Sequence, residues 1–301
     1  MPRPPPATRP DKKMNKNSKL IRMIMPQWQG GNNRAYKLGA ELLAWLAPKT
    51  DSPIVQIGVS PTSEELEFKD DIIGKAPLLK QLDEAAERIR EHSPEKIVML
   101  GGDCLVDLAP FAYLSNKYEK IGILWVDAHP DVMTAAQYKH SHAHVLGMLM
   151  GNGDPDFTKH VKRAVCPDHV MIAGINEPTE YERNFIAEHE IRTASPQDVR
   201  SGNDGIADWI KEEGITHLAI HLDLDVLDSS KFRALLFADP KVDEHHFDGV
   251  AQGKLLLNEV VDLIVKASMN ASVVGIGIAE HLPWDAINLK NALEKLPLLT
   301  E

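Results

Sequence analysis

The sequence predicts an α/β protein in which helices cover both faces of a central, mainly parallel sheet. Short apolar runs alternate along the chain with longer segments of helical periodicity, which is typical of this three-layer α/β/α arrangement. The 301 residues, 43% of them hydrophobic, are enough for one large core. No internal repeat or linker divides the sequence after its first twenty residues. We therefore expect a single domain over residues 21–301.

The expected elements follow one another from residue 50 onward. The short apolar runs predicted as strands are 53–59, 96–100, 121–124, 170–174, 216–220 (which runs on into 221–225) and 272–279. The segments predicted as helices are 73–92, 105–118, 144–150, 179–190, 204–213, 254–267 and 289–298. In the first of these helices Leu78, Leu82 and Ile89 fall at core spacing, with charged residues elsewhere. Each strand is thus followed by a helical connection, as in a parallel sheet.

The first twenty residues have a different composition from the rest. They contain five prolines and four lysines and little that a core could bury, so we expect residues 1–20 to form a disordered tail. The segment lacks the apolar centre of a secretory signal. Two interpretations remain open: a leader ahead of a natural start at Met14, or a basic targeting segment.

Charge and composition exclude several classes of partner. The formal net charge of −11 argues against nucleic-acid binding, which requires a basic surface. No apolar run approaches the roughly 18 residues of a membrane span. The two cysteines, Cys104 and Cys166, imply no disulfide framework and a reducing compartment, so we expect a cytoplasmic protein.

One short motif carries the strongest chemical signal. Asp127, His129 and Asp131 occupy alternate positions directly after the apolar run 121–124. On an extended segment alternate side chains leave the same face, so these three groups would point into one crevice at the carboxyl end of a strand. The motif by itself is also compatible with a polar exit from a strand.

Three further expected strands end in residues of the same kind. Asp223 and Asp225 alternate at the end of one, while Asp103-Cys104 and Glu280-His281 follow two others. So many carboxylates at one sheet edge would repel each other unless cations neutralised them. Two divalent ions about 3.5–4 Å apart, bridged by aspartates, would do so and would activate a water molecule. Carboxylate-rich ligation with imidazole suits manganese but admits iron, nickel or zinc.

These motifs together resemble those of the ureohydrolases, the family of arginases, agmatinases and formiminoglutamases. The pieces that carry the resemblance are Gly101-Gly102-Asp103, Asp127-Ala128-His129-Pro130-Asp131, Asp223-Leu224-Asp225-Val226-Leu227-Asp228 and Glu280, in order and spacing over roughly residues 50 to 300. The resemblance implies an arginase-like α/β fold and hydrolysis of C–N bonds other than peptide bonds by a metal-activated hydroxide. It also implies a homo-oligomer, a trimer or a hexamer.

The resemblance also implies roles for individual residues. Asp127 and Asp223 would bridge two metal ions, with Asp131 completing the first site and His129 and Asp225 the second. Asp131 would also orient or deprotonate the nucleophile. Glu280 would pair with the cationic guanidinium or amidine of the substrate. His144 lies at the spacing of the family's proton-shuttling histidine, and His142 is a neighbouring candidate.

The sequence departs from the family at Cys104, where histidine is usual. A thiolate ligand there would add one negative charge, so that the protein ligands of the two metals would carry −5 and not −4. It would also favour softer ions such as zinc or iron over manganese. Alternatively Cys104 is a buried neutral thiol, and a single metal binds. We favour ligation by Cys104.

The loop that follows the first motif also departs from the family. Residues 132–140 lack the Asn/Thr/Ser-rich sequence with which arginases hold the amino acid, so arginine is not the expected substrate. Tyr138 and Lys139 would contact a different substrate, such as an acidic one, and formiminoglutamate is one candidate. Two other functions stay open: a non-catalytic or single-metal regulatory protein, and a zinc amide hydrolase like the deacetylases.

Overall fold

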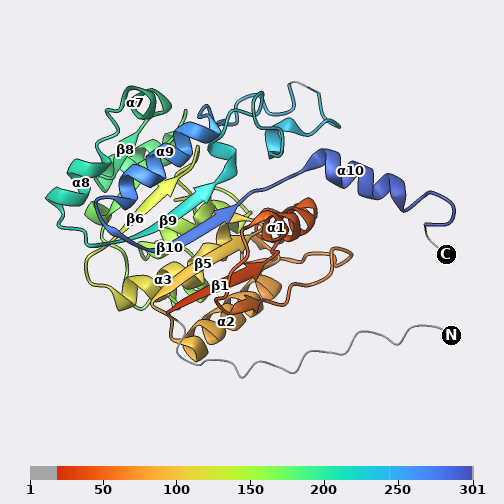
Figure 1. Ribbon diagram of the computed structural model, residues 1–301, viewed down its shortest axis with the longest axis horizontal. Helices are drawn as coiled ribbons and strands as arrows, with labels where there is room; N and C mark the ends of the chain where they lie inside the picture. Colours follow the sequence, from red (N-terminus) through yellow and green to blue (C-terminus); the bar gives the residue numbers. More distant parts are fainter. Residues whose placement is uncertain (1–18, 244, 300–301) are drawn as a thin grey trace.

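The computed structural model describes residues 19–243 and 245–299, which build one eight-stranded parallel sheet between layers of helices (Figure 1). All of its strand pairs are parallel, in the order β2-β1-β5-β10-β9-β6-β7-β8. The strands are β1 (Leu20–Met25), β2 (Ile54–Gln56), β5 (Lys96–Gly101), β6 (Ile121–Val126), β7 (Val170–Ala173), β8 (Arg192–Ala194), β9 (His217–Asp223) and β10 (Ser272–Ala279). A separate antiparallel pair is formed by β3 (Phe68–Lys69) and β4 (Ile72–Ile73).

Helices connect the strands and cover the sheet. The α-helices are α1 (Ala35–Leu46), α2 (Lys75–His92), α3 (Leu108–Lys117), α4 (Val145–Leu149), α5 (Pro155–Thr158), α6 (Glu180–Glu188), α7 (Pro196–Ser201), α8 (Ile206–Glu212), α9 (Leu257–Ser268) and α10 (Trp284–Leu293). The 3₁₀ turns in the described part of the chain are η1 (Cys104–Asp107), η2 (Ser141–His144), η3 (Pro167–His169), η4 (Leu224–Val226) and η5 (Leu236–Ala238). None of the helices in the described ranges is long and apolar enough to span a membrane.

Alternating side chains of the strands divide the core between the two faces of the sheet. On β6, Ile123 and Trp125 join the apolar cluster that includes α2, α3 and α4, whereas Leu124 and Val126 join the cluster that includes α8 and α9. All six residues of β6 are buried. A strand covered on both faces reads as a continuous apolar run, as the run 121–124 does. The predicted three-layer α/β/α fold is confirmed.

Most predicted elements lie where the sequence indicated, and the differences have physical causes. The strand at 272–279 matches β10 at both ends, but the strand at 53–59 shortens to β2. The predicted helix 289–298 is wrong, because α10 begins five residues earlier and ends at Leu293. Its start is fixed by packing, since Trp284 is buried and its indole donates to the Leu235 carbonyl. Figure 1 shows α10 projecting from the body.

The amino-terminal region contains two elements that the sequence did not indicate, β1 and α1. Strand β1 begins at Leu20, so the last residue of the expected tail belongs to the sheet, and residues 1–18 lie outside the described residues. Its buried positions alternate with partly exposed ones such as Arg22, although the strand lies inside the sheet between β2 and β5. A charged residue in a short run obscures the signal of a central strand.

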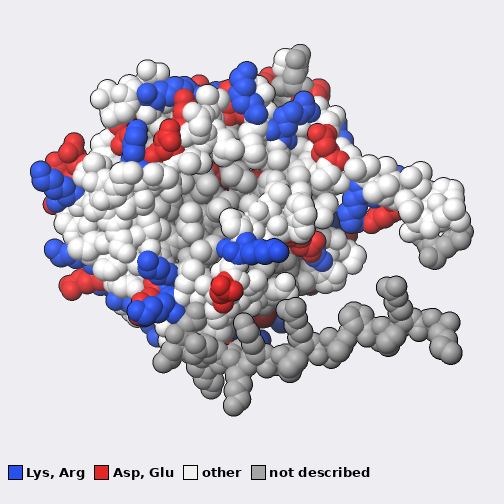
Figure 2. Space-filling view, in the orientation of Figure 1, with Lys and Arg blue, Asp and Glu red and all other residues white. Residues whose placement is uncertain are grey.

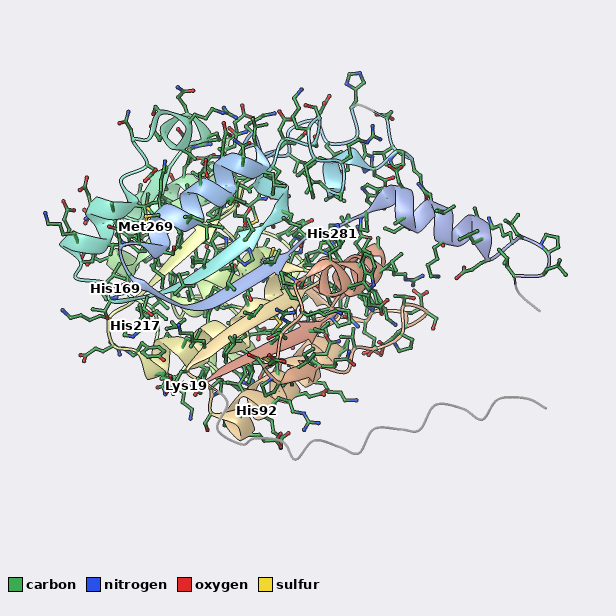
Figure 3. The ribbon with its side chains drawn as sticks, viewed as in Figure 1. Lys19, His92, His169, His217, Met269 and His281 are labelled. Carbon is green, nitrogen blue, oxygen red and sulfur yellow. The ribbon has the colours of Figure 1, made fainter. Side chains whose placement is uncertain are left out.

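The four strands expected to carry ligand residues are immediate neighbours in the centre of the sheet, in the order β5-β10-β9-β6. Because they are parallel, their carboxyl ends lie at one edge. Figure 3 labels both edges: His217 begins β9 at one, and His281, two residues after the end of β10, lies at the other. Polar residues from four distant parts of the chain therefore converge at one edge.

The Gly-Gly-Asp segment after β5 has a backbone role that makes Gly102 hard to replace. Its N–H donates to the Met25 carbonyl, and its own carbonyl accepts the N–H of Glu280. A Cβ at position 102 would lie 1.7 Å from the Gln27 carbonyl oxygen, which backbone hydrogen bonds hold in place. The segment thus joins the ends of β1, β5 and β10.

We expect Gly102→Ala to lower the free energy of unfolding by about 3 kcal/mol, the upper end of the usual cost of overpacking. Urea denaturation measures it. Gly58→Ala is the control, because its new Cβ would meet only the flexible Glu84 carboxylate, at 3.4 Å. A Gly102→Ala protein with the wild-type midpoint would show that the backbone can relax around the added methyl group.

Candidate metal centre

Two groups of potential ligand atoms form at the carboxyl edge of the central strands. In each group the ligand atoms lie within 4.8 Å of one another. The first group contains Cys104, Asp127, His221 and Asp223, and the second contains Asp127, His129 and Asp225. Asp127 belongs to both groups, as expected of a residue that bridges two ions.

Tight turns, not extended backbone, bring the motif side chains together. The Asp127 carboxylate accepts the N–H of His129 at 2.7 Å, and the Asp223 carboxylate accepts the N–H of Asp225 at 2.6 Å. Each motif thus begins with an aspartate that caps its own turn. The expectation that the motif continues as an extended segment is wrong, because β6 ends at Val126 and β9 at Asp223.

The carboxylates are buried so closely together that their charges disfavour one another. Burial and the nearby Asp225, Asp127 and Glu280 carboxylates raise the pKa of Asp223 well above its usual range. Burial and Asp127 do the same to the pKa of Asp131, while burial and Asp225 raise the pKa of Asp127. The Oδ2 of Asp131 and the Oδ1 of Asp225 are buried without a hydrogen-bond partner among the described residues. The cluster therefore offers many carboxylate oxygens, two of them without a hydrogen-bond partner. Such oxygens are suitable ligands for divalent cations.

His129 is held in an orientation that suits metal binding. Its Nε2 is 3.1 Å from the Ala251 carbonyl oxygen, a contact in which the nitrogen must donate. That contact leaves Nδ1 facing the second group, 3.2 Å from Asp225 and 3.4 Å from Asp127, where a metal ion would take the place of its proton. Burial lowers the pKa of this imidazole, but Asp225 and Asp127 together raise it well above the usual value.

Cys104 lies inside the first group as a thiol donor. It begins η1, is 1% exposed, and its Sγ is 3.1 Å from Asp223 and 3.6 Å from Glu280. Burial and then Asp223, Asp131, Glu280 and Asp127 raise the pKa of the thiol well above its usual value. Deprotonation of Cys104 in this setting requires a cation at the same place.

Asp103, the residue before Cys104, has a structural role in which it binds backbone N–H groups. Its carboxylate accepts the N–H groups of Gly30 and Leu105, and burial raises its pKa to about 7.

Glu280 directly follows β10 and has a partner that the sequence did not reveal. The Tyr36 hydroxyl, from α1, donates to its Oε2. Burial and then Glu280 raise the pKa of Tyr36 well above its usual value, so the phenol stays protonated. Burial also raises the pKa of Glu280 well above its range. No motif around Tyr36 signals this contact, because it depends on the packing of α1 against the sheet.

The remaining predicted residues surround the two groups. Asp131 is near Asp127 and Asp225 but belongs to neither group formed by the described residues. Tyr138 is 41% exposed, and the charges of Glu280 and His129 both influence its hydroxyl, so it lies at the rim of the site. The Nε2 of His144 is 2.7 Å from the Tyr138 carbonyl oxygen.

Burial lowers the pKa values of His144 and His142 to about 4, and the charge of His129 is one further cause for His142. The roles of Asp131, Tyr138 and His144, like those of the other predicted site residues, stay predictions.

Sequence reasoning missed His221, which the structure places in the first group. The signal was present, because His221 and Asp223 alternate at the end of β9 as Asp127 and His129 do after β6. Figure 2 shows positive and negative side chains interspersed over one face of the molecule.

A parallel α/β/α sheet with two carboxylate-rich ligand groups at its carboxyl edge defines a protein with a candidate binuclear metal centre. More particularly, the chain belongs to the Arginase family, whose family model matches residues 36–234. That range contains both aspartate motifs and Cys104, whereas Glu280 lies beyond it.

Individual relatives support the same placement. The arginase of Bacillus caldovelox is 31% identical over 169 residues, which cover 50% of this chain and 56% of that protein. The arginase of Staphylococcus aureus strain MRSA252 is 24% identical over 138 residues, 44% of this chain and 46% of that protein. The chain therefore spans about half the length of the curated relatives it matches.

Solved structures show the shared fold over nearly the whole chain. Entamoeba histolytica arginase in complex with L-ornithine has a TM-score of 0.68 at 18% identity, covering 89% of this chain and 92% of that one. Formimidoylglutamase from Bacillus subtilis has a TM-score of 0.61 at 15% identity, covering 91% and 81%. At such identities the likeness concerns the fold.

Proposed function

We propose that this protein is a metal-dependent hydrolase of the C–N bond in a linear guanidino, amidino or formimino compound other than arginine. The observation that carries the proposal is the pair of ligand groups that share Asp127 at the carboxyl edge of the sheet. The family adds support, since the proteins with the same fold include arginases, a formimidoylglutamase and a putative agmatinase.

Most of the site residues would bind the metal ions, and others would bind the substrate. Asp127, His129 and Asp225 would hold one ion, and Cys104, Asp127 and Asp223 the other, with Asp131 beside them. Two divalent ions, manganese by family resemblance or zinc, iron or nickel because of Cys104, would supply a water nucleophile at neutral pH. Asp131, with an unpartnered buried oxygen, would orient that water and accept its proton.

Glu280 would bind the cationic end of the substrate. Its carboxylate is 4% exposed and accepts the Tyr36 hydroxyl at Oε2. A guanidinium or amidinium that donates to this carboxylate would form charge-assisted hydrogen bonds. Tyr138, at the rim, would contact the rest of the substrate, and His144 or His142 would move protons between the site and solvent.

The experiment is metal analysis combined with a substrate panel. Protein from a metal-replete host is expected to carry two equivalents of metal per chain and to release urea, ammonia or formamide from one member of a panel of guanidino, amidino and formimino compounds. Less than one equivalent and no turnover on the whole panel would overturn the proposal.

A second candidate is a non-catalytic family member that binds one metal ion. The hydrogen bond from the Cys104 thiol to Asp223 favours it, because a thiol that stays protonated leaves the first group short of a ligand. This protein would carry one equivalent of metal and no hydrolase activity.

Replacing Cys104 separates the two candidates. If Cys104 is a ligand, Cys104→His is expected to raise manganese occupancy and manganese-dependent activity, because it removes one anion from the first group. Cys104→Ser, which keeps the size, is expected to weaken zinc binding. Cys166→Ser is the control, since Cys166 is an exposed thiol. Unchanged metal content in both Cys104 variants would show that the sulfur does not bind metal.

We further propose a cytoplasmic homo-oligomer, a trimer or a hexamer as in the family. One exposed stripe of α9 is apolar, formed by Leu257, Val261 and Val265, and Met269 directly after the helix extends it. Light scattering after gel filtration measures the mass, and a monomer at micromolar concentration would contradict this.

A further inference from the structure

The buried His221 is the member of the first ligand group that the proposed function leaves without a role. It lies two residues before Asp223 on β9, on the same face of the sheet, and its side chain is 0% exposed. Its ring stacks on the indole of Trp125, with centroids 3.7 Å apart and planes inclined by 15°. This contact fixes the plane in which the two ring nitrogens lie.

One of those nitrogens is held by a buried carboxylate. Nδ1 of His221 is 2.7 Å from Oδ2 of Asp107, a residue of η1 that is itself 0% exposed. The carboxylate lies against β10 where only glycine fits, because a Cβ on Gly277 would be 1.9 Å from Asp107 Oδ2. The lack of a side chain at Gly277 thus makes room for the Asp107 carboxylate. A carboxylate that accepts Nδ1–H leaves the lone pair of the imidazole at Nε2.

The other nitrogen points toward the metal ligands. Nε2 has no hydrogen-bond partner within the described part of the chain, and Asp127 Oδ2 is 4.0 Å away. A ligand nitrogen of His221, Sγ of Cys104 and carboxylate oxygens of Asp127 and Asp223 lie within 4.8 Å of one another. Two ligands of a tetrahedral ion with bonds of about 2.0–2.3 Å are about 3.3–3.8 Å apart. This arrangement is therefore close to that of a four-ligand site.

We propose that His221 is a metal ligand through Nε2 and that Asp107 is its positioning residue, so that Cys104, Asp127, His221 and Asp223 form the first metal site. The inference deepens the proposed function, on which it rests. The Asp107–His221–metal chain has the form in which a carboxylate orients a ligating histidine and raises its basicity. The imidazole would supply the nitrogen that the site lacks because position 104 is a cysteine.

The composition of this site determines which metal it prefers. One sulfur, one nitrogen and two carboxylate oxygens in a four-ligand arrangement suit zinc, whereas manganese prefers oxygen ligands at higher coordination number. The second site, with Asp127, His129 and Asp225, has no sulfur ligand. We therefore expect the two sites to differ, the first selecting zinc and the second accepting manganese as well.

Zinc titration against a chromophoric chelator is the first test. Wild-type protein is expected to bind two equivalents. His221→Phe keeps a ring against Trp125 and is expected to bind one. Asp107→Asn is expected to bind two, with the affinity of the first site lowered about 10–100-fold, the usual effect of losing such a partner. His217→Phe is the matched control, because His217 lies on the same strand and also stacks on an aromatic ring, that of Tyr118, with centroids 4.2 Å apart.

X-ray absorption at the zinc edge is the second test and does not depend on whether the His221 variant folds. In His129→Ala protein loaded with one equivalent of zinc, an imidazole in the ligand shell, together with one sulfur, supports the proposal. A shell of sulfur and oxygen alone overturns it. Wild-type zinc affinity in both His221→Phe and Asp107→Asn would overturn it equally.

Failure of this inference and failure of the proposed function are distinguishable. If wild-type protein binds no metal, both fail. If it binds two ions and hydrolyses a member of the substrate panel, but His221 is absent from the ligand shell, only the inference fails. The Asp107–His221 pair would then be a buried hydrogen-bonded pair with a structural role.

Discussion

Replacing Asp127 with asparagine is expected to reduce metal content from two equivalents to less than one and to lower kcat/KM by at least about 10³-fold, or about 4 kcal/mol of transition-state stabilisation. Asp127 is the residue that both ligand groups share. An amide of the same shape removes one negative charge from both sites at once. Metal analysis and the turnover of the substrate identified by the panel measure the two effects.

The local structure makes this substitution a test of charge. One Asp127 oxygen accepts the His129 N–H at 2.7 Å and the other accepts the Trp125 indole N–H at 3.0 Å. Asparagine can keep one of these contacts, so circular dichroism should show a folded protein with lower stability. Asp262→Asn, at an exposed position of α9, is the matched control and should behave as wild type. An Asp127→Asn enzyme with wild-type activity would rule out the bridging assignment.

The site residues that could be predicted from the sequence are those that belong to short motifs next to a predicted strand. Asp127 and His129, or Asp223 and Asp225, follow apolar runs within a few residues, and the rules for parallel sheets bring the ends of those runs to one edge. The same reasoning found the strands that became β5, β6, β9 and β10, because buried strands in such sheets are continuous apolar runs.

The residues that it missed depend on contacts between distant segments. Tyr36 reaches Glu280 across 244 positions, and Asp107 reaches His221 across 114. A tyrosine in an amphipathic helix and an aspartate after a glycine-rich turn have ordinary local explanations. Only the packing of α1 and η1 against the sheet gives them a place near the site. His221 differs, since its spacing to Asp223 was visible in the sequence.

The opposite pH dependence of metal-free and metal-loaded protein is the second large effect that we expect. Asp131, Asp223 and Glu280 all have pKa values raised well above the usual range by burial and then by one another's charges or that of a neighbouring aspartate. A carboxyl whose pKa is higher in the folded than in the unfolded state binds protons more tightly when folded. Stability is therefore lost as pH rises from the unfolded pKa through the folded one.

The range of pH 7 to 8.5 isolates this effect. The lowered pKa values of His142 and His144, about 4, act with the opposite sign, but only below their unfolded value of 6.5. Asp103, with a pKa of about 7, has released much of its proton at the start of the range. The raised pKa of His129 acts in the same direction as those of the carboxyls, because a cation stabilised by folding is lost as pH rises. Metal-free protein should therefore lose about 1.4 kcal/mol per pH unit for each carboxyl still protonated in the folded state.

Metal binding reverses this trend because cations compete with protons for the same oxygens. Thermal melts in EDTA and in excess zinc, at pH 7.0, 7.5, 8.0 and 8.5, should diverge, with the difference in Tm growing as pH rises. Asp131→Asn removes a buried carboxylate with an unpartnered oxygen and should flatten the slope in EDTA. Metal-free protein that becomes more stable from pH 7 to 8.5 would contradict this. The carboxylates would then be compensated by the fold itself, and the physical case for two metal ions would be lost.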